Sequence, residues 1–329
     1  MKRRTTISDV AAAASVSRST VSRVFSQPSL FLPETVARVQ EAAARLGYVP
    51  NPQAKALSTG TMAAIGLVVP DIGNPFFPPL IRAAGLRATQ SEVAVLIGDS
   101  EEDAQREASA LERLVTRTDG IILVSSRQST TAIRAFAARL PLILVNRDIP
   151  GIPRVLTATA PGVSRAVTHL AELGHRHLAY LVGPRRSWSN QERLAAATQM
   201  SEELGLELTL LTGYHPTYDE GARAARAIVA SGATALIAFD DLMAQGAMAG
   251  LTHMGVTVPD DISVVGCDNL LAARTYPPLT SIQARSDEAG IAAVDLLLSG
   301  AGDDACIQLP GELIVRSTTA PPRVFPLVD

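Results

Sequence analysis

The chain has 329 residues, more than a single compact core usually holds, so its length predicts two or three domains. It contains no run of 18 uninterrupted apolar residues, and its first residues lead into polar ones instead of the apolar core of a signal peptide. We therefore expect a cytoplasmic protein without a membrane span. The two cysteines, Cys267 and Cys306, lack metal-ligand spacing and are expected to be reduced and buried. We expect no metal and no other cofactor.

The charge is unevenly distributed along the chain. Within the first 60 residues, eight Lys and Arg stand against three Asp and Glu, which gives a net charge of +5. The remaining residues carry −8, so that the whole chain has −3. A small basic module joined to a larger acidic one is typical of a DNA-binding headpiece on a ligand-binding body.

Two short helices are predicted near the N-terminus. Residues 6–9 have the form of a capping box at the start of a helix that stops at Ser15, and Ser17 offers the cap of a second helix over residues 18–25. The alanines of the first helix let the second one cross it closely, and valines fill the space between them. This pattern predicts a helix-turn-helix.

The second helix carries polar residues that suit DNA. Arg18, Ser19 and Thr20 lie in its first turn, and Arg23 follows about one turn later. Arginine can donate two hydrogen bonds to guanine, and hydroxyls can contact phosphates or base edges. A helix pair with a solvated polar face has the same local pattern, so the following elements must distinguish the two interpretations.

Two further helices are predicted after this pair. Pro33 near the first turn, apolar residues at helical spacing and Gly47 as the stop predict a third helix that closes a three-helix core. Beyond it, Asn51 can cap a helix of under two turns that carries Leu57, a side chain able to wedge between base steps. An ordinary linker explains residues 58–61 but not this capped segment.

Residues 6–11, 16–24 and 46–51 closely resemble the LacI/GalR family of bacterial transcriptional regulators. The resemblance implies a helix-turn-helix headpiece over residues 1–50 and a hinge helix with linker over 51–62. It places Arg18, Ser19 and Arg23 as base readers. The full set of DNA-binding residues that we expect is Thr6, Ser17, Arg18, Ser19, Thr20, Ser22, Arg23, Asn51, Ala54 and Leu57.

The body alternates short strand-like runs with longer helix-like segments, which predicts an α/β fold of doubly wound parallel sheets. One set of predicted strands covers 65–69, 93–97, 120–124 and 142–145, and a second set covers 178–182, 208–211, 235–239 and 262–266. Two lobes whose strand ends face each other would enclose one cleft, because ligands of open α/β sheets bind at the carboxyl ends of the strands.

Polar and aromatic residues follow these strands, including residues 125–127, 146–148, 185–189 and 214–218. Aromatic rings, carboxylates, amides and an arginine suit a sugar-like or nucleobase-like ligand, through stacking and directional hydrogen bonds. The effector-binding residues that we expect are Asp71, Asn74, Phe76, Phe77, Ser125, Trp188, Ser189, Arg193, Tyr218, Asp240 and Asp268.

The body, residues 63–329, resembles the effector-binding and dimerisation domain of the same family, which is two-lobed and periplasmic-binding-protein-like. The resemblance is carried by residues 69–77, 173–177, 239–244, 258–266, 278–282 and 313–317. The resemblance places Arg193 and Asp268 at frequent ligand-contacting positions, and Asp240 where sugar-binding members often have Asn. Structural alternatives exist: the phenylalanines could pack within a lobe, Asp268 could cap a turn, and Arg193 could bridge two helices. His175 and His177 are expected at a turn and on the surface.

Three classes of function compete for this chain. An enzyme is disfavoured, because GxSxG, GxxxxGK[ST], strand-following GxGxxG and HExxH motifs are all missing. A transported-solute receptor would fit the body but neither the basic headpiece nor the lack of a signal peptide. We therefore expect a repressor that binds operator DNA as a homodimer, or a tetramer, without membrane contact. A sugar or sugar acid would release it, and control by a corepressor such as a purine is the alternative.

Overall fold

The computed structural model describes residues 5–49 and 61–323. The chain separates into a headpiece, Met1–Ala64 with Arg117–Asp119, and a body formed by the rest. The predicted hinge helix, with Asn51, Ala54 and Leu57, lies outside the described residues. Within the described ranges, no helix is long and apolar enough to cross a membrane.

Three α-helices form the headpiece, as predicted. They are α1 (Ile7–Ala14), α2 (Arg18–Ser26) and α3 (Pro33–Leu46), with a short 3-10 turn η1 (Pro28–Leu30) before the last. The Asp9 carboxylate accepts hydrogen bonds from the backbone N–H and the hydroxyl of Thr6, both at 2.8 Å, and so fixes the start of α1. Gly47 ends α3 in the left-handed conformation that favours glycine (φ 60°).

The headpiece core is built from small and β-branched side chains. Val10, Val21, Val24 and Val39 are almost completely buried and pack with the alanines of α1 and α3. The alanines keep the helices close, and the valines fill the space between them. The predicted helix-turn-helix packing is confirmed, and it leaves the polar side of α2 exposed.

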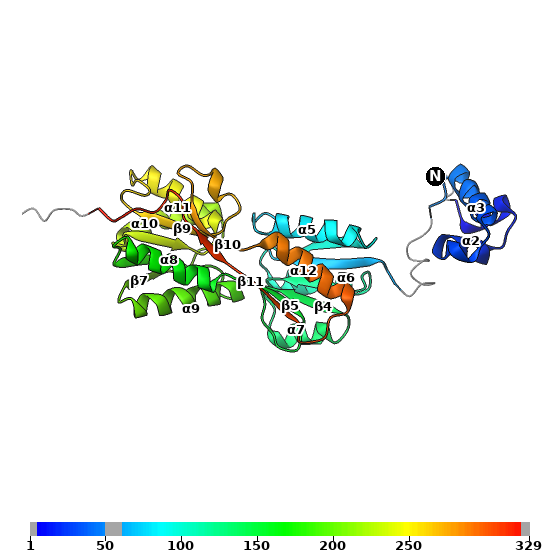
Figure 1. Cartoon of the computed structure of the whole chain (residues 1–329), viewed down its shortest axis with the longest axis horizontal. Coiled ribbons are helices and arrows are strands. Elements are labelled where there is room, and N and C mark those ends of the chain that lie inside the picture. Colours follow the sequence, from blue (N-terminus) through cyan, green and yellow to red (C-terminus); the bar gives the residue numbers. More distant parts are fainter. Residues whose placement is uncertain (1–4, 50–60, 324–329) are drawn as a thin grey trace, which may run out of the picture. The chain divides into compact units, whose positions relative to one another are not determined.

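The N-terminal lobe of the body contains a six-stranded sheet in the order β11-β5-β4-β3-β1-β2. Helices α5 and α12 lie side by side on one face of this sheet, and α6 and α7 cover the other face (Figure 1). The strands are β1 (Ala64–Val69), β2 (Ala94–Asp99), β3 (Ile121–Val124), β4 (Leu142–Val145), β5 (Arg154–Ala158) and β11 (Cys306–Pro310). The helices are α5 (Phe77–Thr89), α6 (Ala104–Val115), α7 (Thr130–Ala137) and α12 (Ser286–Ser299).

The C-terminal lobe repeats this plan with the strand order β12-β10-β9-β8-β6-β7. Helices α8 and α9 pack on one face and α10 and α11 on the other, and β12 runs antiparallel to β10. The strands are β6 (His177–Leu181), β7 (Glu207–Leu211), β8 (Ala235–Ala238), β9 (Ser263–Asp268), β10 (Thr280–Gln283) and β12 (Glu312–Ile314). The helices are α8 (Ala160–Glu172), α9 (Trp188–Glu203), α10 (Tyr218–Ala230) and α11 (Asp241–His253), with a 3-10 turn η2 (Ala272–Arg274).

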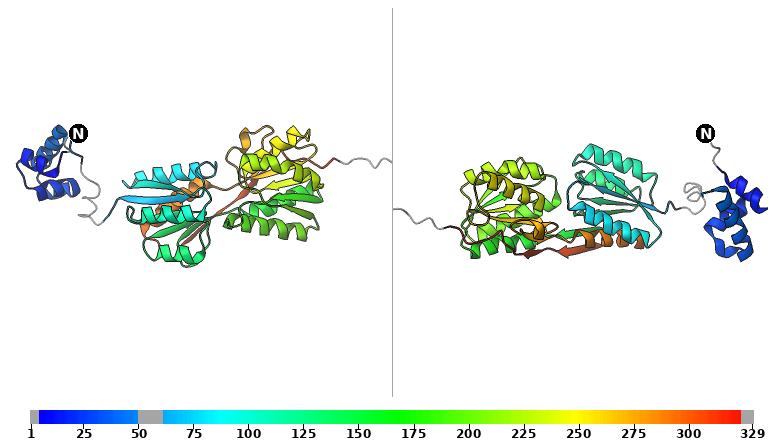
Figure 2. Two further views of the ribbon diagram at one scale, coloured as in Figure 1. Left: turned by 180° about the vertical axis from the view of Figure 1, so that it is seen from behind. Right: turned by 90° about the horizontal axis from the view of Figure 1, so that it is seen from above.

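The chain passes between the two lobes three times. It does so from β5 to α8 at Thr159, from β10 to α12 at Ala284–Arg285, and from β11 to β12 at Gly311. Figure 2 shows the last of these passages as the red strand that runs from one lobe into the other. The two-lobed architecture predicted from the sequence is therefore confirmed, with four strands (β5, β10, β11 and β12) beyond the eight predicted.

Two expectations about single residues were wrong. His175 is buried rather than on the surface: its Nδ1 lies 2.8 Å from the Thr234 hydroxyl, and its Nε2 lies 3.0 Å from the Ala320 carbonyl oxygen. It joins the chain after α8 to the C-terminal segment. Cys306 is exposed, because it begins β11 at the edge of its sheet, whereas Cys267 is buried as expected.

Glycines allow α10 and α11 to touch along their backbones. A Cβ atom at Gly246 would fall on the Tyr218 carbonyl oxygen, and one at Gly250 would fall on the Ala222 carbonyl oxygen. We expect Gly246→Ala to destabilise the body by about 1–3 kcal/mol or more, because the helices must move apart. Gly85→Ala is the matched control: it also lies within a helix but has free space around it, so its better helix propensity should leave stability unchanged or slightly higher. Thermal unfolding of both variants tests this, and equal melting temperatures would contradict the tight packing.

Candidate functional sites

The first candidate site is the exposed side of α2. The Ser17 hydroxyl caps the helix by accepting the Thr20 N–H at 3.0 Å, and it lies 2.7 Å from the Ser19 hydroxyl. Arg18 and Arg23 are exposed and form no ion pair within the described residues. Because a helix N-terminus attracts anions and α2 has no acidic residue, this side of the headpiece suits a phosphate-lined groove.

The other residues expected at DNA occupy different environments. Thr6 is exposed but is engaged with Asp9 at the start of α1. Thr20 and Ser22 are half-buried at the edge of the exposed side of α2. The structure therefore brings Ser17, Ser19, Thr20 and the two arginines of α2 together, while Thr6 lies on another helix.

The second candidate site is a pocket in the body to which both lobes contribute. The N-terminal lobe provides Asn74, Phe76, Phe77, Glu102, Ser125, Arg127 and Asn146. The C-terminal lobe provides Ser187, Ser189, Arg193, Pro216, Phe239, Asp240 and Asp268. The free volume of the pocket is about 40 Å³, which suffices for water but not for a sugar. A larger ligand therefore requires the lobes to separate or the lining side chains to move.

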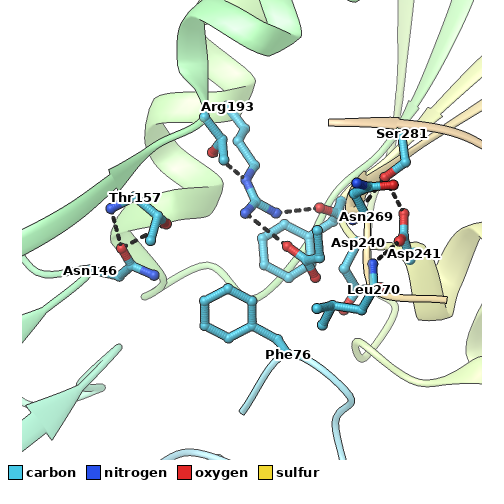
Figure 3. A network of polar contacts seen from close by, with 12 residues as sticks. Phe76, Asn146, Thr157, Arg193, Asp240, Asp241, Asn269, Leu270 and Ser281 are labelled. Atoms are coloured by element: carbon cyan, nitrogen blue, oxygen red, sulfur yellow. Dashed lines mark hydrogen bonds and ion pairs between the residues drawn. The ribbon is translucent and has the colours of Figure 1, made fainter. Parts of the chain in front are cut away.

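Arg193 of α9 is the central polar residue of this pocket (Figure 3). It is buried, and its Nη2 lies 3.2 Å from an oxygen of Asp268 while its Nη1 donates to the Phe239 carbonyl oxygen at 2.5 Å. Its Nε donates to the Thr159 hydroxyl at 2.9 Å, and the guanidinium lies 5.0 Å from the centre of the Phe239 ring. Arginine has five N–H donors in a rigid fork, so two N–H groups remain for a ligand.

Asp240 connects the two lobes. One of its carboxylate oxygens accepts the Met243 N–H at 2.8 Å, which caps α11, and the other accepts the side-chain amide of Asn74 at 3.1 Å. Asn74 is itself oriented by the N–H of Phe76, which donates to its side-chain oxygen at 3.0 Å. This hydrogen bond joins residues of different lobes directly across the pocket.

A second buried network supports the N-terminal side of the pocket. Arg127 donates to both carboxylate oxygens of Glu102, at 2.6 and 2.9 Å, and its Nη1 donates to the Ser125 carbonyl oxygen. Glu107 accepts the Arg127 N–H at 2.9 Å and also the Ser126 hydroxyl. Burial raises the pKa of Glu107, and these hydrogen bonds partly oppose the rise.

The structure places eight of the eleven expected effector residues at this pocket. The other three lie elsewhere: Asp71 accepts the Gly73 N–H in a turn, Trp188 begins α9, and Tyr218 begins α10 with 43% of its surface exposed. Glu102 and Phe239 also line the pocket but did not emerge from the sequence. Asn146 and Arg127 followed predicted strands, so the strand-end rule did indicate them.

Three buried carboxyl groups share one buried arginine here. Burial raises the pKa of Asp240 and Asp268, and the charge of Arg193 only partly offsets this. Asp241 accepts the Ser281 hydroxyl at 2.6 Å and the Leu270 N–H at 3.2 Å, and burial raises its pKa to about 7. No group of three or more His, Cys, Asp or Glu suited to a metal occurs within the described part of the chain.

The raised pKa of Asp241 predicts how stability changes with pH. Between the ordinary pKa of an aspartate and about pH 7, the folded protein keeps a proton on Asp241 that the unfolded chain has released. Stability is therefore lost as the pH rises through this range, by about 1.4 kcal/mol per pH unit for one full proton. Melting temperatures from pH 5 to 8 should fall less steeply for Asp241→Asn than for the wild type, and parallel curves would contradict the assignment.

Comparisons with known proteins follow the same division of the chain. Residues 6–51 match the family model of bacterial regulatory proteins, lacI family, and residues 167–319 match a periplasmic binding protein-like domain. The HTH-type transcriptional regulator DegA of Bacillus subtilis is 32% identical over 97% of this chain and 99% of its own length. The match to DegA therefore includes both the helix-turn-helix and the body.

Solved structures of regulators with bound ligands share this fold. The lac repressor dimer bound to operator and the anti-inducer ONPF has a TM-score of 0.87 at 28% identity, over 97% of this chain and all of that chain. A LacI family regulator from Enterococcus faecium with bound ribose has a TM-score of 0.72 at 28% identity, over 79% of this chain and all of that chain. The chain therefore belongs to the lacI family of bacterial regulatory proteins, and it is a DNA-binding transcriptional regulator rather than an enzyme.

Proposed function

We propose that this regulator is a repressor whose release from operator DNA is controlled by a neutral sugar bound between the two lobes. The observation that carries the proposal is the pocket formed by both lobes, with Arg193 and Asp268 on one side and Asn74 and Phe76 on the other. Aromatic rings beside buried, directional polar groups suit a polyhydroxylated ring. The ribose-bound relative from Enterococcus faecium supports this ligand class.

The charges of the pocket favour a neutral sugar over a sugar acid. Glu102 is paired with Arg127 and Asp268 with Arg193, whereas Asp240 forms no ion pair with a described residue of the pocket. A ligand carboxylate would add another negative charge to this buried site. The repulsion between like charges is poorly screened there. Sugar hydroxyls can instead donate to these carboxylates and accept from Arg193.

We also propose that the protein acts as a homodimer on a pseudo-palindromic operator. One short recognition helix reads too few base pairs for useful specificity, and two helices related by a two-fold axis read two half-sites. The structure of the lac repressor dimer on operator supports this arrangement. A footprint on DNA selected by the protein should show two symmetric half-sites.

A thermal-shift screen tests the ligand class. Purified full-length protein is heated with neutral aldoses and disaccharides, with sugar acids, and with purines. We expect neutral sugars to raise the melting temperature, and Arg193→Met to remove this rise. Gln199→Met, on the exposed side of the same helix, is the control and should keep it. A rise with purines alone would favour corepression, and a rise that persists in Arg193→Met would show that the pocket is not the sugar site.

A further inference from the structure

The three chain segments that join the lobes meet at one point. The Gly311 N–H donates to the Ala158 carbonyl oxygen at 2.8 Å. A Cβ atom on Gly311 would lie 2.9 Å from the Gln283 carbonyl oxygen and 2.9 Å from the Thr159 Cα. The three passages are therefore packed without room for a methyl group. Any rotation of one lobe against the other must change the backbone torsions of these three passages. Together they form the hinge between the lobes, which is distinct from the predicted hinge helix.

Thr159 has the place of a helix cap but does not act as one. It precedes α8, yet its hydroxyl makes no capping hydrogen bond, although threonine usually caps helices through that group. Its side chain is buried, and its hydroxyl accepts the Nε–H of Arg193 at 2.9 Å. The hydroxyl is thus directed at the pocket arginine instead of at its own helix.

A ligand that binds Arg193 can act on the hinge through this residue. Its other two hydrogen bonds go to Phe239 and Asp268, both within the C-terminal lobe. The guanidinium is planar and rigid, so a ligand that fixes the two Nη atoms also fixes the direction of the Nε–H. That N–H points to Thr159 at the first passage between the lobes.

We propose that Thr159 is a positioning residue that links Arg193, and hence the bound effector, to the hinge between the lobes. The inference rests on the proposed function and adds a route by which a ligand changes the relative positions of the lobes. A ligand seated on Arg193 holds Thr159 in one conformation, which favours one arrangement of the three passages. Without the Thr159 hydroxyl, the ligand still binds in the pocket but no longer acts on the hinge directly.

The matched variants are Thr159→Val, which keeps the shape of the side chain without the acceptor, and Thr159→Ser, which keeps the acceptor. D-ribose, D-galactose and cellobiose serve as probes, each titrated into the full chain with and without selected operator DNA. The ratio of the two affinities measures the coupling between the sites. For the wild type we expect a ratio of about 5 to 150.

Thr159→Val should bring this ratio close to one while leaving sugar-free operator affinity unchanged. Thr159→Ser should keep the wild-type ratio. A residue that only stabilised the fold would lower the melting temperature without changing the ratio. A wild-type ratio in Thr159→Val would therefore overturn the inference, whatever happens to the sugar affinity.

Hydrogen exchange provides a second measurement that needs no sugar. The amides of Val163 and Gly311, both hydrogen-bonded at the hinge, should exchange faster in Thr159→Val than in the wild type and Thr159→Ser. If none of the three sugars binds the wild type, this exchange decides the hinge link alone. Equal exchange in the valine and serine variants would overturn the link. If Thr159→Val does not fold, Thr159→Ser is compared with the wild type instead. Loss of the wild-type ratio of sugar affinities in Thr159→Ser, which keeps the hydroxyl, would overturn the link.

Discussion

Asp268→Ala is expected to abolish the response of operator binding to sugar. Asp268 lines the pocket and accepts from Arg193, so its removal takes away one ligand acceptor and leaves the arginine charge buried without its partner. Hydrogen bonds to charged groups contribute about 1.5–3 kcal/mol, which corresponds to a loss of sugar affinity of about 10- to 150-fold. Isothermal titration of the purified variant measures this loss.

Operator affinity without sugar should stay near the wild-type value in Asp268→Ala, because Asp268 belongs to the body and acts on operator binding only through the bound sugar. Asp71→Ala is the control, since Asp71 lies in a nearby turn and does not line the pocket. It should bind sugar almost as the wild type does. If Asp268→Ala fails to fold, the interpretation of Asp268 as a structural residue is the correct one. Unchanged sugar affinity in Asp268→Ala would exclude Asp268 from the binding site.

Arg18→Ala is expected to lower affinity for the selected operator by about 1–3 kcal/mol, or roughly 5- to 150-fold, and to relax preference at one base position. Arg18 is the first residue of α2 and extends from the exposed side of that helix. Fluorescence anisotropy with the operator and with a set of single-base variants measures both effects.

Arg38→Ala provides the matched loss of one positive charge. Arg38 is exposed on α3, a different helix from the one that carries Arg18. Arg38→Ala should reduce binding to operator and to random DNA by the same small factor, as expected for loss of a charge that acts independently of sequence. If Arg18→Ala also weakens both kinds of DNA equally, Arg18 contacts phosphate and reads no base.

The headpiece could be predicted almost completely because its signals are local. The Asp9 and Ser17 caps and the Gly47 stop each act within a few residues, and the structure contains all three helices that they indicate. In the body, the eight strands rich in valine, leucine and isoleucine were equally clear. Caps and apolar runs of this kind need no knowledge of the remote chain.

The four strands that were not predicted depend on remote pairing. β12 has three residues, and β5 and β11 combine polar residues with short length at the edge region of one sheet. These segments form strands because they pair with other strands that lie far away in the sequence. For example, β11 pairs with β5 across about 150 residues. They also carry the passages between the lobes, so the hinge could not be predicted.

The effector pocket was predicted in part for the same reason. Strand ends indicated Asn74, Arg193, Asp240 and Asp268, since parallel strands end at one edge of a sheet. The rule cannot tell which residue of a loop faces the cleft. Tyr218 therefore entered the prediction, although it begins a helix outside the pocket. Glu102 follows a strand by three residues and reaches the pocket through its pair with Arg127.

The reciprocal effect of sugar and operator tests the proposed control most directly. The neutral sugar that gives the largest thermal shift is titrated into the full chain, once alone and once with saturating operator. Linkage requires that operator weaken sugar binding by the same factor by which sugar weakens operator binding. We expect that factor to lie between about 5 and 150. Equal sugar affinities in the two titrations would contradict control by that sugar, and tighter binding in the presence of operator would contradict release.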